Sequence, residues 1–223
     1  MSDTTSRRSD HLRASPPLLP IASLDRLTRV HHLVPVVIYV PVIAVLLVLG
    51  LGRTSALAAI GLLVAGYLLW TLAEYWIHRV VFHFEPEGGW GAKVHFLIHG
   101  VHHEHPNDPL RLVMPPLASI PLAAAFCLLY RWIFGPDLWM PVAAGFLAGY
   151  VIYDELHYLL HHYVPSNRIG KRLRELHMRH HFQDDTRGFG ISAPYWDRVF
   201  RTNVRQRRGV PESAARRPTS RRP

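Results

Sequence analysis

Histidines at regular spacing are the residues in this sequence that could do chemistry. The segment HFLIHGVHHEHP, residues 95–106, holds five of the sixteen histidines in the 223-residue chain. Histidine is the commonest metal ligand and titrates near neutral pH, so such a cluster indicates a metal site, a proton path or a pH sensor. The pattern HxxHH occurs twice, at 99–103 and 177–181, and two further histidine pairs end apolar segments. Burying so many imidazoles without partners is costly, which favours a metal site.

Helix geometry predicts which histidines lie on one face and can share a site, although it does not assign each imidazole to an ion. Each residue of an α-helix turns the chain by about 100°, so residues three and four apart share a face. The triplets at 99, 102 and 103 and at 177, 180 and 181 have this spacing, as does the pair at 157 and 161. His78 and His83 are five apart, about 140° round an ideal helix. Either the helix unwinds before His83 or these two residues reach different metals.

These four groups together make ten expected ligands. One ion can hardly use ten side chains, whereas two ions could, so the count predicts a dinuclear site. Imidazole suits iron and zinc alike, and the Irving–Williams order favours zinc over ferrous iron, so purified protein could carry zinc even where the native metal is iron. The predicted ligands are His78, His83, His99, His102, His103, His157, His161, His177, His180 and His181.

Three histidines near this set rank below it. His162 points about 100° away from His161, so we expect it beside the metal ligands or as a proton carrier. His95 lies one turn before His99 and could join its face, while His105 has a weaker claim.

Two carboxylates could orient the ligands. A metal-bound imidazole usually donates its other N–H to such a partner. Glu74 is one turn before His78, and Asp154 is three residues before His157, so both are predicted to support these rings. The alternatives are that another helix satisfies Glu74 and that water solvates Asp154.

Other metal chemistries fit the sequence less well. The HExxH motif of thermolysin-type proteases is absent, and a haem cytochrome would need facing histidines at mid-depth in its helices. Cys127 is the single cysteine, which excludes a disulfide within the chain and disfavours a thiolate site. Zinc could only polarise water or a carbonyl group, whereas iron could activate O₂ and attack an unactivated C–H bond.

Long apolar segments must hold these histidines in place. Hydrophobic residues make up 49% of the chain, and four stretches of them are each long enough to cross a bilayer. We therefore predict an all-α integral membrane protein whose cytosolic helical cap holds the dinuclear site. Transmembrane helices are expected at about 33–51, 56–82, 112–134 and 138–162, with the turn RWIFGPD between the last two. The cap would be 83–111 and 163–202, flanked by basic tails at 1–32 and 203–223.

Basic residues orient these helices. Of the 25 lysines and arginines, all but Arg53 and Arg131 lie on one side of the predicted membrane. The positive-inside rule places that side, with both termini and the cap, in the cytoplasm. The same distribution accounts for most of the net charge of +9 without a nucleic-acid partner. The short, arginine-rich chain leads us to expect a bacterial inner membrane.

The two tails are expected to be basic segments outside the membrane domain. The first thirty or so residues show no small-residue cleavage site, so a removable signal peptide is not expected. Histidines 11, 31 and 32 in this segment should be solvated or interfacial. The segment 203–223 is expected to be disordered and attracted to anionic headgroups.

The motifs around the histidines resemble the membrane fatty acid hydroxylase superfamily. HRVVFH, HFLIHGVHHEHPNDPLRLVMPP, YDELHYLLHH and HMRHHFQDDTRGFGISAPYWDRVF are most similar to the fatty acid 2-hydroxylases, which act on sphingolipid acyl chains, over about residues 70–202. The resemblance implies an oxygen-dependent monooxygenase with two metals, iron in the active enzyme, bound by the ten histidines. One atom of O₂ would enter the substrate and the other would leave as water. It also places Tyr153, Trp196 and Asp197 near the site.

Two departures from the family pattern affect partners and detail. Many members carry a fused cytochrome b5 domain with an HPGG motif, which is absent here. Electrons are therefore expected from a separate cytochrome b5, ferredoxin or reductase. Arg201 stands where the family often has glycine.

Three alternatives stay open at this point. Two lie in the same superfamily, a desaturase and an oxidase of sterols or other lipids. The third, outside enzymes, is a metal transporter or sensor, which would want its ligands along a path through the middle of the membrane. The expected substrate is a fatty acid or another acyl lipid of the membrane.

Overall fold

The computed structural model describes residues 2–204 of the chain, and these form helices and loops without a β-strand. Two of the helices, η1 and η2, are π-helical turns. The predicted disordered tail lies outside the described residues from 205 onward. In chain order the elements are α1 (Ser2–Leu12), α2 (Ala22–Arg26), α3 (Leu33–Leu51), α4 (Ala56–Trp76), η1 (Ile77–Phe82), α5 (Gly89–His95), η2 (Phe96–Gly100), α6 (Val101–Glu104), α7 (Pro116–His162), α8 (Arg168–Phe182) and α9 (Tyr195–Val199).

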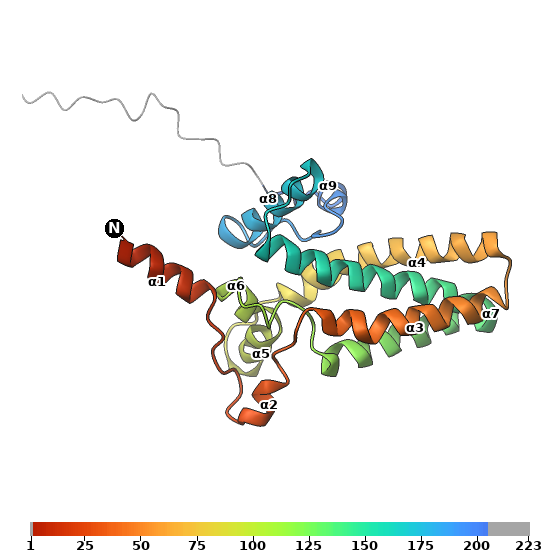
Figure 1. Cartoon of the computed structure of the whole chain (residues 1–223), viewed down its shortest axis with the longest axis horizontal. Coiled ribbons are helices and arrows are strands. Elements are labelled where there is room, and N and C mark those ends of the chain that lie inside the picture. The colour runs from red at the N-terminus through yellow and green to blue at the C-terminus, as the bar shows by residue number, and fades with distance from the viewer. Residues whose placement is uncertain (1, 205–223) are drawn as a thin grey trace, which may run out of the picture.

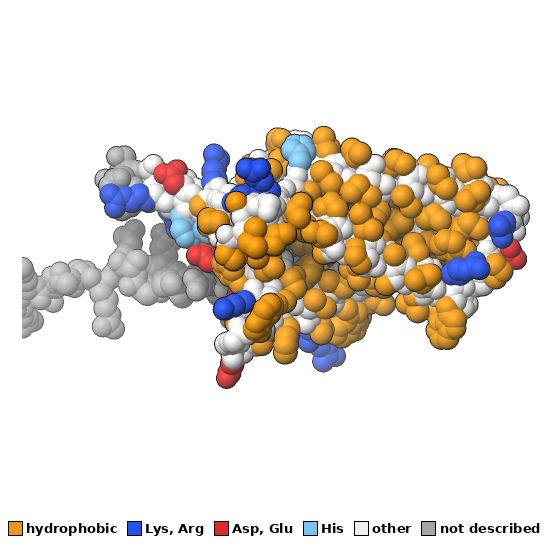
Figure 2. Space-filling view, turned by 90° about the horizontal axis from the view of Figure 1, so that it is seen from below, with side chains coloured by type: hydrophobic (Ala, Val, Ile, Leu, Met, Phe, Trp, Pro, Cys, Tyr) orange, Lys and Arg blue, Asp and Glu red, His pale blue; other side chains and the backbone are white. Residues whose placement is uncertain are grey.

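Three of these helices are long and apolar enough to cross a membrane. They are α3, α4 continued by η1, and α7. The first two have the bounds expected from the apolar runs, 33–51 and 56–82. Hydrophobic side chains cover the visible face of the bundle that they form, and charged side chains gather at its two ends (Figure 2). This distribution is that of a membrane protein, because lipid tails offer no partner to an exposed charge.

The helix α7 folds back on itself. Its backbone leaves the helical region at Gly135, where φ is 72°. The rings of Phe126 and Phe146 have centroids only 4.5 Å apart, although twenty residues of straight helix would span about 30 Å. The two halves of α7 are therefore antiparallel, and both reach the end of the bundle farthest from the small helices (Figure 1). The reversal occurs in the predicted RWIFGPD turn.

The first half of α7 begins later than expected. The apolar run predicted a helix from residue 112, but α7 begins at Pro116. Proline fits the first turn of a helix, where its missing N–H is not needed, and disfavours helix in the residue before it. Leu112 and Val113 are buried in the connection that leads into α7.

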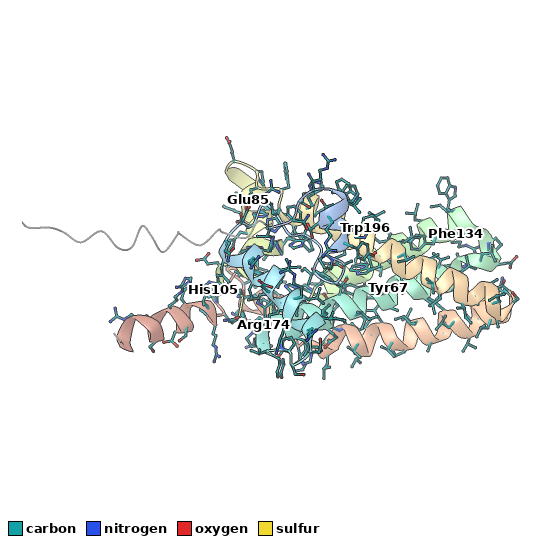
Figure 3. All side chains as sticks on the ribbon, turned by 90° about the horizontal axis from the view of Figure 1, so that it is seen from above. Tyr67, Glu85, His105, Phe134, Arg174 and Trp196 are labelled. Atoms are coloured by element: carbon teal, nitrogen blue, oxygen red, sulfur yellow. The ribbon has the colours of Figure 1, made fainter. Side chains whose placement is uncertain are left out.

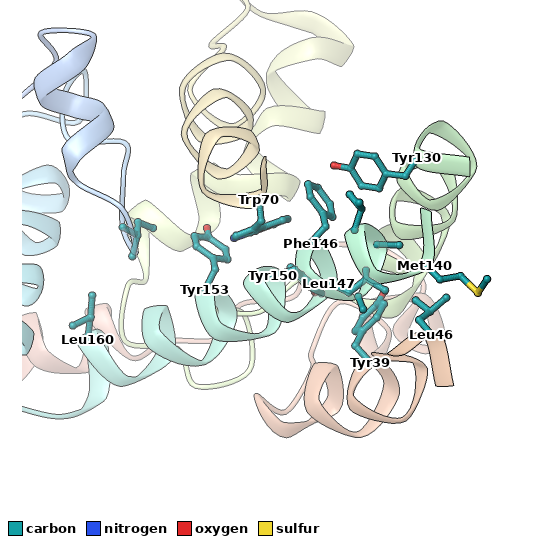
Figure 4. Close-up of a cluster of buried hydrophobic side chains, with 14 residues drawn as sticks. Tyr39, Leu46, Trp70, Tyr130, Met140, Phe146, Leu147, Tyr150, Tyr153 and Leu160 are labelled. Carbon is teal, nitrogen blue, oxygen red and sulfur yellow. The ribbon is translucent and has the colours of Figure 1, made fainter. Parts of the chain in front are cut away.

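Close contacts between α4 and α7 build the core of the bundle. Buried rings, among them Trp70, Phe146 and Tyr150, fill the space between the helices (Figure 4). Two glycines let the backbones approach. A Cβ at Gly66 would lie 2.0 Å from the Val142 carbonyl oxygen, and one at Gly145 would lie 1.9 Å from the Leu63 carbonyl oxygen. Small residues at helix interfaces allow this packing in membranes.

We expect Gly66→Ala or Gly145→Ala to destabilise the bundle. Each added methyl must push two backbones apart, and overpacking of this kind costs about 1–3 kcal/mol. The thermal midpoint in detergent should fall by several degrees. Gly61→Ala is the matched control, because nothing lies within 4 Å of a Cβ at that position on the same helix. An equal midpoint for all three variants would contradict the close helix contact.

Part of the segment predicted as a basic amino-terminal tail packs against the rest of the chain. The buried Asp25 carboxylate accepts a 2.6 Å hydrogen bond from the Leu18 N–H and lies 2.7 Å from Arg29 and 3.6 Å from Arg111. The Val30 N–H also donates to the Leu110 carbonyl oxygen at 2.7 Å. Burial of one ion-paired carboxylate therefore ties residues 18–30 to the connection before α7.

His32 departs from the expected solvation as well. Its ring stacks on Tyr158 with centroids 4.0 Å apart, and its Nδ1 lies 2.9 Å from the Glu155 carboxylate. His31 is exposed, as expected.

Candidate metal centre

The ten predicted ligands converge in two clusters of five at one end of the bundle. We name them cluster A and cluster B. Within each cluster the five ligand atoms all lie within 4.8 Å of one another. His105 and Arg174 mark this end of the molecule, and Phe134 lies at the opposite end (Figure 3). Cluster A contains His78, His83, His99, His103 and His180, and cluster B contains His102, His157, His161, His177 and His181.

The two clusters adjoin each other and share elements. The consecutive pair 102 and 103 sends one ring to each cluster, and so does the pair 180 and 181. The rings of His103 and His181, from different clusters, have centroids only 4.3 Å apart. The ten histidines therefore form one continuous candidate site with two adjoining groups of ligand atoms.

Each of the two histidine triplets divides between the clusters. Within a triplet the residues four apart stay together, as in the pairs 99 and 103 and 177 and 181, and the pair 157 and 161 also stays together. The third histidine of each triplet turns to the other cluster. The third residue of each triplet points in a direction different enough from the other two to reach the adjoining cluster.

A π-helical turn joins His78 and His83 in cluster A. The His83 N–H donates to the His78 carbonyl oxygen at 3.1 Å, the i to i+5 bond of a π-helix. This wider turn brings residues five apart onto one face, and the two ring centroids are 5.0 Å apart. The helix therefore widens before His83, and both residues belong to the same cluster.

The nitrogen positions fit metal ions. A ring nitrogen binds zinc at about 2.0–2.1 Å, so nitrogens round one ion lie about 3–4 Å apart. In cluster A the Nε2 atoms of His78 and His103 lie 3.2 and 3.1 Å from that of His99. In cluster B both ring nitrogens of His102 and of His181 are buried without a hydrogen-bond partner. Buried polar atoms normally have partners, and an ion would supply them here.

Burial keeps the cap imidazoles in the form that binds metal. Loss of water lowers the pKa of His83 to about 3 and that of His103 to about 2, with the neighbouring His180 as the next cause. Burial also holds the pKa of His102 and His177 well below the usual value. A neutral imidazole has a free nitrogen lone pair, so these rings are ready to bind a cation at neutral pH.

A loop after α8 orients two ligands in cluster A. His78 donates from Nδ1 to the Phe189 carbonyl oxygen, and His180 donates from Nδ1 to the Arg187 carbonyl oxygen, both at 2.7 Å. These bonds leave Nε2 of each ring free for a metal. Sequence reasoning missed both acceptors because they are backbone atoms. The only signal is the glycine pair that flanks Phe189, and Gly188 has a φ of 82°.

Buried carboxylates hold this loop. Asp197 accepts from the N–H groups of Phe189 and Gly190, each at 2.9 Å, and from the Thr202 hydroxyl at 2.7 Å. Glu74 accepts from the backbone N–H of Ser192 at 2.7 Å and from its hydroxyl. The expected contact of Glu74 with His78 is therefore absent among the described residues, because the Phe189 carbonyl already takes that N–H.

Replacing Asp197 by asparagine should weaken metal binding. The amide can keep only one of the two backbone bonds, which loosens the carbonyls that orient His78 and His180. Loss of an outer partner of this kind typically costs about 10–100-fold in metal affinity. Metal retention against increasing chelator measures the effect. Asp185→Asn, an exposed change in the same region, is the control. Retention equal to that control would show that the loop does not depend on Asp197.

The remaining predicted residues lie around the centre rather than in it. Asp154 is buried, and within residues 2–204 it makes no hydrogen bond to His157, so the predicted support of that ring is absent there. Tyr153 contacts the His157 ring with centroids 5.8 Å apart. His162 packs against Tyr158 and belongs to neither cluster.

Three further side chains serve the surrounding structure. His95 bonds the Phe82 carbonyl oxygen and His105 bonds the His11 carbonyl oxygen, both at 2.7 Å. Trp196 donates to the Thr71 hydroxyl at 3.1 Å and docks α9 on α4. Arg201 has a φ of 58°, the left-handed region where glycine is favoured.

A small apolar cavity in the bundle lies near cluster B, separated from it by the Tyr153 ring. Its volume is about 20 Å³, well below that of a ligand pocket. The Trp70 ring in its wall contacts Tyr153, which in turn contacts His157. The lining residues are Trp70, Met114, Ser119, Leu122, Ala123, Phe126, Phe146, Leu147 and Tyr150.

Comparisons with known proteins agree on the family. The fatty acid hydroxylase family model matches residues 63–202. The chain is 40% identical over 166 residues to dihydroceramide fatty acyl 2-hydroxylase FAH2 of Arabidopsis thaliana, covering 74% of this chain and 70% of that protein. It is 42% identical over 150 residues to fatty acid 2-hydroxylase of Rattus norvegicus, covering 65% of this chain and 40% of that protein.

A solved structure of full-length scs7p, in which only the hydroxylase domain is visible, is also similar. It matches with a TM-score of 0.76 and 38% identity, covering 82% of this chain and 70% of that one. The chain thus spans much of the plant relative and less than half of the rat relative. Since the family model covers more than half of its residues, the chain belongs to the fatty acid hydroxylase family.

Proposed function

We propose that this protein hydroxylates a lipid acyl chain with O₂, at the carbon beside the carbonyl group. The observation that carries the proposal is the pair of five-histidine clusters at one end of an apolar helix bundle. Relatives that are about 40% identical over the aligned residues are named fatty acyl and fatty acid 2-hydroxylases. Neutral nitrogen ligands beside apolar helices suit oxidation of a hydrocarbon better than hydrolysis of a polar bond.

We infer that each cluster holds one iron ion. The five rings of cluster A would bind one ion and the five of cluster B the other. Bound iron would supply O₂ activation, whereas zinc at the same ligands would leave the C–H bond untouched. The residues of the chain hold the ligands neutral and fix the orientation of His78 and His180 through backbone carbonyls. A separate cytochrome b5, ferredoxin or reductase would provide electrons.

The proposed membrane topology has four crossings. α3 and α4 each cross once, and the two antiparallel halves of α7 cross once each. Both clusters then lie at one membrane face, under a cap formed by the segments at 83–111 and 163–202. The excess of lysine and arginine on that side supports a cytoplasmic position for the cap and both termini.

Lipid mass spectrometry tests the proposed activity. Cells that express the protein with a source of reductant should accumulate acyl lipids that are heavier by one oxygen atom. Growth under isotopically labelled O₂ should place the label in the new hydroxyl group, because water is not the oxygen source. Loss of two hydrogens instead would indicate a desaturase. Lipids identical to those of an empty-vector strain would contradict the proposal.

A further inference from the structure

The cap exposes an apolar face between η1 and α6. We call residues 84–98 the collar segment. Phe84 is 66% exposed and Trp90 is 82% exposed, and Val94, Leu97 and Ile98 are also exposed. A cap surrounded by water would not hold so many large apolar side chains in contact with it.

The opposite face of the same stretch supports cluster A. His99 and His103 follow the collar segment directly and belong to cluster A. The Phe82 ring stacks on His99 with centroids 4.9 Å apart, and His95 holds the Phe82 carbonyl oxygen at 2.7 Å. The stretch therefore has a ligand face toward the metal centre and an apolar face toward the surroundings.

An aromatic and basic pair on α4 and η1 marks the level of the membrane surface. The exposed Trp76 lies under the Arg79 guanidinium, 5.5 Å from the ring centroid, and Arg79 also donates to the Tyr75 hydroxyl at 3.0 Å. Tryptophan and arginine prefer the boundary between headgroups and hydrocarbon. His78 lies between these two residues in the chain, so cluster A is at that boundary.

Exposed apolar side chains continue beyond this level. Val80 and Val81 are both exposed, and Phe84 follows them in the collar segment. In Figure 2 hydrophobic side chains run from the bundle onto the elements at its left end. The apolar surface of the bundle is thus continuous with that of the cap.

A second segment exposes apolar residues as well. Ile21, Leu24 and Leu27 on and beside α2 point away from the protein, while Asp25 between them is buried against Arg111. The ion pair fixes α2 with its apolar residues outward.

We propose that the collar segment lies in the lipid leaflet and sets the depth of the metal centre at the boundary between headgroups and acyl chains. The occupant of the apolar face is the leaflet itself, because this face continues the lipid-facing surface of the helices. The inference deepens the proposed function. The carbon beside the carbonyl of a membrane lipid lies at this same boundary, so a centre held there meets that carbon without extracting the lipid.

Spin labelling in vesicles tests the position of the collar segment. Single cysteines at Trp90 and Val94, in a Cys127→Ser background, would carry nitroxide labels in full-length protein in phosphatidylcholine vesicles. Both labels should collide more with O₂ than with a water-soluble nickel chelate, like a label at the lipid-facing Val45. A label at Asp185 should show the reverse. If the labels in the collar segment collide with the nickel chelate as often as the label at Asp185 does, the inference is wrong. This outcome does not depend on whether the protein hydroxylates lipids.

Turnover provides a second test of the depth-setting role. Trp90→Glu should draw the segment toward water and lower product formation at least fivefold in vesicles, with both metal ions retained. Trp90→Phe keeps an apolar ring and should restore turnover. Equal turnover by these two variants would overturn the role. Absence of product in the wild type would instead refute the proposed function. The spin-label result would then still decide whether the collar segment lies in the leaflet.

Discussion

Removing two ligands from either cluster should abolish lipid hydroxylation. His99→Ala with His103→Ala leaves three rings in cluster A, and His157→Ala with His161→Ala leaves three in cluster B. We expect product to fall at least about 100-fold in each double variant, since loss of even an outer partner of a metal ligand typically costs 10–100-fold. Lipid mass spectrometry of cells with equal protein levels measures the effect.

The control for this prediction is a histidine outside both clusters. His31 is exposed and belongs to neither cluster, so His31→Ala should leave product unchanged. Because the two double variants damage different clusters, equal loss in both would indicate that the reaction needs the complete dinuclear centre. Full activity in either one would show that its cluster has another role.

Metal removal should produce the second large effect, on stability. An ion that binds only the folded chain adds about 4.1 kcal/mol when its free concentration is a thousand times Kd. For a chain of this size each kcal/mol shifts the thermal midpoint by about 2–4 °C. Stripping one ion with a chelator should therefore lower the midpoint by roughly 8–16 °C, and stripping both should lower it further. Differential scanning fluorimetry in detergent measures the shift.

Adding the metal back shows whether the lower thermal midpoint comes from loss of metal or from damage by the chelator. Adding ferrous iron without oxygen should return the midpoint to its first value. The variant His102→Ala with His180→Ala, which removes one ligand from each cluster, should begin lower and respond less to the chelator. A wild-type midpoint indifferent to chelator and iron would contradict the idea that ions hold the buried rings together.

The sequence predicted the long helices and the convergence of the ten histidines, for physical reasons. Bilayer thickness sets the length of an apolar run, so the bounds of α3 and of α4 with η1 could be predicted. Histidines near membrane helix ends rarely serve packing, so the ten residues could be chosen from spacing alone. Glycine followed by proline at 135 and 136 marked the reversal within α7.

Three features could not be predicted from the sequence. The division of ligands between clusters depends on a π-helical turn at 77–82 and on small differences in helix direction, which ideal α-helix geometry lacks. The acceptors for His78 and His180 are backbone carbonyls, which leave no side-chain signature. The ordering of residues 18–30 depends on the buried pair of Asp25 and Arg111, 86 residues apart in the chain, which no local pattern reveals.

Counting metal ions per chain tests the central claim most directly. The protein would be purified without chelators and analysed by inductively coupled plasma mass spectrometry against its amino-acid content. Two ions per chain are predicted for the wild type, and one for a variant that lacks two histidines of either cluster. A wild-type protein that forms hydroxylated lipid while holding one ion or none would contradict the two-cluster account.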